Sequence, residues 1–219
     1  MDERINGSAW RAPVAVLLAI FLVNDIGLYL APSAFEWLLV DYVSKVMALA
    51  VLFAAPVLRG SIAGLFGSLR RENEDVVTAW VRTGILVVLA LAVLVALEEF
   101  LMPVLREILP TDRLVKFPEI DSVPLYWVDM TFGLALTAVS EELIFRGVLR
   151  RALAGAIPGI VSMVIVSSLI FGVVHWGHGL PNVIYAALAG VVLMVLYLRT
   201  GSILPGIVVH YVIDAWYFA

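Results

Sequence analysis

Residues 130–146 read MTFGLALTAVSEELIFR, an apolar run that ends in two adjacent glutamates followed by an arginine. No other ionisable side chain occurs within this stretch, and long apolar runs return after Arg151. A charge inside a bilayer costs roughly 2.5–3.5 kcal/mol on insertion scales, so it rarely persists without a partner or a task. Glu141 and Glu142 therefore mark a candidate site within a membrane-spanning helix.

The rest of the chain is equally apolar. Of its 219 residues, 63% are hydrophobic and 15% are charged, and the mean hydropathy is +1.03. Soluble domains average about 25% charged residues. Apolar runs long enough to cross a bilayer recur along nearly the whole chain. We therefore predict an all-α, polytopic transmembrane helical bundle. The absence of cysteine excludes disulfides and thiolate chemistry, and the few, clustered basic residues give no sign of nucleic-acid binding.

The breaks between apolar runs predict seven spans, or eight if one segment is re-entrant. The predicted spans are 12–31, 37–58, 79–101, 124–148, 158–176, 182–199 and 203–218. They form one integral membrane domain over 1–219, with N-terminal spans and a loop in 1–78 and the functional core in 79–219.

Basic residues predict the orientation, because Lys and Arg accumulate in cytoplasmic loops. Three basic residues, Arg106, Arg113 and Lys116, fall on one predicted side. Ten fall on the other: Arg4, Arg11, Arg59, Arg70, Arg71, Arg82, Arg146, Arg150, Arg151 and Arg199. We expect an integral protein of a bacterial or archaeal plasma membrane with a cytoplasmic N-terminus.

Helix geometry separates the two glutamates. Glu142 and Arg146 are i,i+4 and can neutralise each other. Glu141 lies about 100° around the helix and has Phe145 as its own i,i+4 neighbour, so it lacks a local counter-charge. We interpret Glu142 and Arg146 as a structural pair and Glu141 as the reactive carboxylate. The alternative is a charged cluster at the membrane edge.

The histidines favour the reactive interpretation. His175 shares a helix face with Phe171, and His210 shares one with Asp214. A lone intramembrane histidine is more often a helix–helix hydrogen bonder than a catalyst. Here two histidines, a free carboxylate and an aspartate occur in the last four spans, as a polar cavity requires.

Two chemistries fit this set. In the first, Glu141 and His175 polarise a water that attacks a peptide carbonyl, and His210 with Asp214 stabilises the oxyanion. An oxyanion donor of this kind contributes roughly 10²–10³ in rate. In the second, His175, His210 and Glu141 bind zinc, which activates the water. We favour the first chemistry, which requires no cofactor.

The remaining polar groups have simpler interpretations. Asp41 and Lys45 are i,i+4 and should pair. Asn24-Asp25 and Glu98-Glu99 are expected at the interface, and His178 in a solvated loop. Residues 62–75 form either an interfacial amphipathic segment or an ordinary polar loop. The small residues of the sixth span, Ala186, Ala187 and Gly190, indicate close helix packing.

The ordered motifs Glu141-Glu142-x-x-x-Arg146, Phe171-x-x-x-His175 and His210-x-x-x-Asp214 resemble those of the CPBP family of intramembrane proteases. That family includes the Rce1-type CAAX prenyl endopeptidases and the bacterial Abi proteins. The resemblance covers roughly 79–219.

The resemblance implies a role for each motif. Glu141 works with His175 on the attacking water, Glu142 and Arg146 support them, and His210 with the fourth residue after it forms the oxyanion site. This chain has Asp214 where the family often has Asn, and an ionised Asp cannot donate an N–H. The family has been described both as zinc-dependent and as glutamate-dependent.

The predicted function is therefore intramembrane hydrolysis of a peptide bond in a membrane-embedded or lipidated protein or peptide. The alternatives are a non-enzymatic Abi-type immunity or regulatory protein, and a proton-coupled transporter. Straight helices with the predicted bounds would hold His175 and His210 at different depths. We expect the bounds, rather than the constellation, to be wrong.

Overall fold

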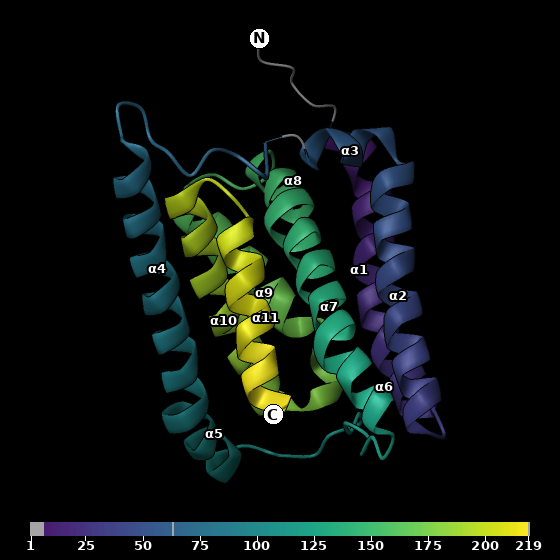
Figure 1. Cartoon of the computed structure of the whole chain (residues 1–219). Coiled ribbons are helices and arrows are strands. Elements are labelled where there is room, and N and C mark those ends of the chain that lie inside the picture. Colours follow the sequence, from purple (N-terminus) through teal and green to yellow (C-terminus); the bar gives the residue numbers. More distant parts are fainter. Residues whose placement is uncertain (1–6, 63, 219) are drawn as a thin grey trace.

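The computed structural model describes residues 7–62 and 64–218, so Arg4 lies outside the described residues. These residues form an all-helical bundle in which the only β-contact of the described chain is an isolated bridge between Phe66 and Ser202. Figure 1 shows the long helices side by side and roughly antiparallel. The predicted fold class is confirmed.

The helices follow one another with short interruptions. Their bounds are α1 (Gly7–Leu30), α2 (Ala34–Ala54), α3 (Pro56–Ile62), α4 (Val76–Ala96), η1 (Leu97–Leu101), α5 (Met102–Ile108), α6 (Val123–Val128), η2 (Asp129–Gly133), α7 (Leu134–Glu141), η3 (Glu142–Leu149), α8 (Arg150–Ala154), α9 (Ile160–Val173), η4 (Trp176–His178), α10 (Leu180–Thr200) and α11 (Leu204–Phe218).

Four helices of the described residues are long and apolar enough to cross a membrane: Trp10–Leu30, Ala34–Ala54, Val76–Ile108 and Leu180–Thr200. α9 and α11 are apolar too but have only 14 and 15 residues. At 1.5 Å per residue such helices fall short of a core about 30 Å thick. The chain is an integral membrane protein, and the number of seven or eight spans stays a prediction.

Local sequence signals explain several helix ends. Ser33 caps α2 by accepting a hydrogen bond from the Glu36 N–H at 3.4 Å, and Asp75 caps α4 by accepting from the Thr78 N–H at 3.0 Å. α10 ends at Gly201, whose φ of 72° lies in the left-handed region that favours glycine.

Three π-helical turns interrupt the long helices without breaking them. η1 joins α4 to α5, and η2 and η3 lie within the helix that runs from α6 to α8. This helix continues to Ala154, six residues beyond the predicted end of the fourth span. π-helical turns are frequent at functional sites, and η3 begins with Glu142.

α9 and α10 approach each other closely, as the small residues of the sixth predicted span indicate. A Cβ atom added at Gly190 would lie 3.1 Å from the Ser168 Cα, and one added at Gly172 would lie 2.8 Å from the Ala187 Cβ. α11 packs against α4, α7 and α10, and in Figure 1 it descends in front of α10 between α4 and α7.

The segment predicted as either an interfacial helix or a polar loop is a loop over residues 64–75. Leu65 is buried in it, and its carbonyl accepts a hydrogen bond from the Ile203 N–H at 2.8 Å. Arg82 at the start of α4 donates to the Leu69 carbonyl and forms an ion pair with Glu74 at 2.9 Å. The loop is therefore attached to the ends of α4 and α10.

Candidate active site

A cavity of about 250 Å³ lies inside the bundle. α7, α9, the turn after α9, and α11 each contribute polar or aromatic side chains to its wall. The predicted site residues that line it are Glu141, Phe171, His175, His210 and Asp214. The structure thus brings the predicted constellation together around one space.

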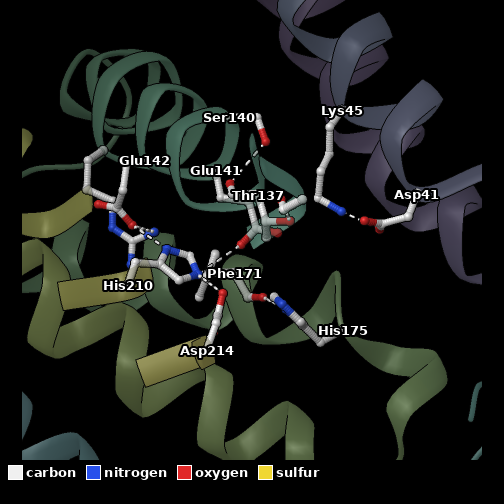
Figure 2. A network of polar contacts seen from close by, with 12 residues as sticks. Asp41, Lys45, Thr137, Ser140, Glu141, Glu142, Phe171, His175, His210 and Asp214 are labelled. Atoms are coloured by element: carbon white, nitrogen blue, oxygen red, sulfur yellow. Dashed lines mark hydrogen bonds and ion pairs between the residues drawn. The ribbon is translucent and has the colours of Figure 1, made fainter. Parts of the chain in front are cut away.

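His210 on α11 is the most connected of these side chains (Figure 2). Its Nδ1 lies 3.0 Å from Glu142 Oε1, and its Nε2 lies 3.7 Å from Glu141 Oε2 and 3.6 Å from Asp214 Oδ2. Because a carboxylate can only accept, the short contact assigns a proton to Nδ1. Nε2 is then the nitrogen that faces Glu141 and Asp214.

The predicted pair of Glu142 and Arg146 is present. Arg146 Nη1 lies 3.2 Å from Glu142 Oε1, and both side chains are at most 1% exposed. The Arg146 guanidinium also lies over the Phe171 ring, 4.4 Å from its centroid, in a cation–π contact. The pair therefore connects the start of η3 to α9.

Glu142 has a second partner that sequence reasoning missed, because it bonds to His210 as well as to Arg146. Gly206 makes room for it: a Cβ atom there would lie 2.9 Å from Glu142 Oε2. Gly206 and His210 are i,i+4 on α11, so the missing side chain and the imidazole share one face. The i,i+4 spacing of Gly206 and His210 is the sequence feature from which this contact could have been predicted.

Glu141 is only 5% exposed, and its Oε2 has no hydrogen-bond partner in the described part of the chain. This agrees with the predicted lack of a local counter-charge. Glu141 Oε2 lies 3.7 Å from His210 Nε2, which is longer than a hydrogen bond. A buried carboxylate oxygen that faces a cavity and remains unsatisfied is available to a water or a substrate.

His175 lies in the turn after α9, outside the helix in which it was predicted. Its Nδ1 lies 2.8 Å from the Phe171 carbonyl, which can only accept, so this nitrogen carries the proton and Nε2 keeps its lone pair. The Phe171 ring stands between the two histidines, 5.0 Å from the His175 ring and 6.1 Å from the His210 ring. Because α9 is short and ends before His175, both histidines reach the same cavity.

The donor arrangement does not fit a zinc ion. Among the described residues no three His, Asp or Glu side chains are placed to hold a metal. Each histidine donates its Nδ1–H, His210 to Glu142 and His175 to a carbonyl, so only the two Nε2 atoms are left to ligate a metal, and in the described structure they are not grouped with Glu141 as a metal site. The set proposed from sequence for zinc, His175, His210 and Glu141, would have to rearrange to bind one.

The N-terminal helices contribute more to the cavity than the sequence indicated. Asp25 was expected at the interface but is 3% exposed and lines the cavity. Asp41 and Lys45 form the predicted buried ion pair, and they line the cavity too. Glu98 of η1 lines it too and pairs with Arg106 at 3.0 Å.

His178, expected in a solvated loop, is instead enclosed. Its ring stacks on Phe117 with centroids 4.9 Å apart and planes 16° apart, and its side chain is 11% exposed. That expectation is wrong because residues 109–122 fold back over the turn that carries His178, which no local pattern indicates.

Comparison with protein families bears on the C-terminal part of the chain. Residues 123–216 match the family model described as Type II CAAX prenyl endopeptidase Rce1-like. The chain carries an Rce1-like region. This region runs from α6 to α11 and contains all the predicted site residues, and it confirms the resemblance to the CAAX protease family. Searches of curated proteins and of solved structures found no match.

The Rce1-like region begins at residue 123. The resemblance based on the motifs was expected to begin earlier, at about residue 79. The Rce1-like region therefore leaves α1, α2 and α4 outside, although α1 and α2 line the cavity through Asp25, Asp41 and Lys45. The match of this region to a protease family model points to a protease.

Proposed function

We propose that this protein is an intramembrane endopeptidase that hydrolyses a peptide bond near the C-terminus of a lipidated or membrane-embedded substrate. One observation carries the proposal. The unsatisfied carboxylate of Glu141, the free Nε2 of His175 and the Nε2 of His210 all belong to one cavity within a membrane bundle. The match to a CAAX prenyl endopeptidase family supports the substrate class.

The attacking group is a water held between Glu141 and His175. Both side chains line the cavity and no hydrogen bond joins them in the described structure, so the proposal places the water where it contacts both. Glu141 takes a proton as the water oxygen bonds to the scissile carbonyl carbon, and it returns that proton to the leaving amine when the C–N bond breaks. The products are a carboxylic acid and an amine.

His210 is placed to stabilise the oxyanion. In its imidazolium form both ring nitrogens donate, Nδ1 to Glu142 and Nε2 toward the substrate oxygen. Asp214, 3.6 Å from Nε2, orients the ring and stabilises its charge instead of donating to the oxyanion itself. This assignment accounts for an aspartate where the family often has asparagine.

The proposal places the chain in a bacterial or archaeal plasma membrane, with the Arg11 end of α1 in the cytoplasm. It requires no cofactor. The lipid bilayer and the substrate are its partners, and 1–219 act as one domain because α1 and α2 complete the wall of the cavity.

The decisive experiment uses full-length protein in liposomes with a farnesylated, internally quenched CAAX-type peptide. Glu141→Gln and His175→Ala should each lower kcat at least about 100-fold, because general base catalysis contributes roughly 10²–10⁴. Glu119→Gln, an exposed acid in the loop between α5 and α6, is the matched control and should keep wild-type activity.

A parallel experiment looks for natural substrates. In cells that carry Glu141→Gln in place of wild type, uncut membrane proteins should accumulate and be visible by C-terminal proteomics. Unchanged processing of the peptide and of every membrane protein in both catalytic variants would overturn the proposal.

A further inference from the structure

The turn between α9 and α10 sets the position of His175, because this residue is no longer part of a helix. α9 ends at Val173, and the His175 N–H donates to the Gly172 carbonyl at 3.0 Å with φ −99° and ψ 24°. The turn closes over the short helix η4 and ends at Gly179, whose φ is 89°. The placement of the imidazole therefore depends on the contacts that hold this turn.

Asp25 of α1 makes the central contact. Its Oδ2 accepts a hydrogen bond from the Gly177 N–H at 2.8 Å in a buried setting, and its Oδ1 lies 3.8 Å from His178 Nε2. Gly177 has no space for a side chain, since a Cβ atom would lie 2.8 Å from Asp25 Oδ2 and 2.9 Å from the Val115 Cγ2. The carboxylate therefore touches the backbone of the turn two residues from His175.

The loop between α5 and α6 holds the turn from the opposite side. The Val115 N–H donates to the Gly177 carbonyl at 2.8 Å, and Phe117 stacks on His178. A third tie runs back to α1, where the Trp176 Nε1–H donates to the Leu22 carbonyl at 3.0 Å. Both polar groups of the Gly177 backbone are thus bonded, one to α1 and one to the loop.

We propose that Asp25 is a positioning residue: through the Gly177 amide it holds the turn so that His175 Nε2 faces the water beside Glu141. This inference rests on the proposed function for its catalytic consequence. Asp25 belongs to α1, which lies outside the Rce1-like region. In this role, α1 helps to position the catalytic groups of that region. A displacement of about 1 Å at a reacting group can cost on the order of 100-fold in rate.

The test compares Asp25→Leu with Asp25→Asn in full-length protein in liposomes. Leucine has the same branching but is larger and offers no acceptor, so the turn is displaced and loosens, and kcat falls about 10- to 100-fold while KM changes less than about twofold. Asparagine keeps an oxygen for the Gly177 N–H, so it restores most of the activity. Hydrogen–deuterium exchange of the segment that contains Gly177 should accelerate in Asp25→Leu and remain slow in Asp25→Asn.

Asn24→Leu is the matched control, because it changes the neighbouring polar side chain of α1 to the same residue. In the described structure the Asn24 Oδ1 has no hydrogen-bond partner, so this substitution removes no bond to the turn. Its turn should exchange as slowly as in wild type. Equal acceleration in Asn24→Leu, wild-type kcat in Asp25→Leu, or lost kcat with an unchanged turn would each overturn the inference. If Asp25→Leu does not fold, a failure of Asp25→Asn to keep the turn protected overturns it equally.

The proposed function and the positioning role of Asp25 can be refuted independently of each other. Exchange of the turn does not depend on proteolysis, so unchanged processing in Glu141→Gln would overturn the proposed function alone. Loss of activity in Glu141→Gln together with wild-type kinetics in Asp25→Leu would overturn only the role of Asp25.

Discussion

Substitution of Gly172 by alanine should weaken the bundle through a single methyl group. The added Cβ would lie 2.5 Å from the Val183 carbonyl oxygen, 2.8 Å from the Ala187 Cβ and 3.1 Å from the Ala187 nitrogen. All three atoms belong to the backbone or first side-chain carbon of α10, so no rotamer change can relieve the contact. α9 must move away from α10 and take Phe171 and His175 with it. Such overpacking costs about 1–3 kcal/mol.

The assay is reversible unfolding of the purified protein in mixed detergent micelles. Gly172→Ala should lower the free energy of unfolding by about 1–3 kcal/mol and reduce kcat by displacing His175. In Gly190→Ala the added Cβ would lie 3.1 Å from the Ser168 Cα, so this substitution should lower the free energy of unfolding less. Gly84→Ala is the control, because nothing lies within 4 Å of the added atom and alanine favours the helix. A Gly172→Ala protein as stable as Gly84→Ala would refute the close approach of α9 and α10.

Three other measurements test the site and its surroundings. Glu142→Leu leaves Arg146 buried without its carboxylate and should cost about 3–5 kcal/mol in unfolding free energy, whereas the double variant with Arg146→Met should recover most of this loss yet stay inactive because His210 lacks its acceptor. The hydrogen bond from Arg82 holds the pKa of Glu74 below its usual 4.5, so the carboxylate stabilises the folded protein above that pH and loses this effect as the pH falls through the lowered pKa. The melting temperature of Glu74→Gln should therefore lie below that of wild type at pH 7, and the difference should close in acid; a difference that persists in acid would contradict this. Finally, protein dialysed against a chelator should keep its peptidase activity, and stoichiometric zinc whose removal abolishes activity would contradict the metal-free mechanism.

Helix positions were predictable because apolar composition and local breaks act over a few residues. Pro32, Gly159 and Gly201 lie at or near helix ends, and the i,i+4 pairs of Glu142 with Arg146 and of Asp41 with Lys45 form as helix geometry requires. The extent of the helices was harder to predict. The helix through Glu141 runs through two π-helical turns and continues to Ala154, whereas the pattern of apolar runs and breaks placed its end at 148.

The sequence by itself determined a membrane-embedded helical protein with one unpaired acid, Glu141, and two histidines in its last spans, because bilayer insertion costs and helix periodicity depend on composition and spacing alone. Only the tertiary structure decided what those groups touch. The bond from Glu142 to His210 joins residues 68 apart, and the bond from Asp25 to Gly177 joins residues 152 apart. Contacts of that separation follow from how α1, η3 and α11 pack in space, and packing within a uniformly apolar bundle leaves little trace in the local pattern of any one helix.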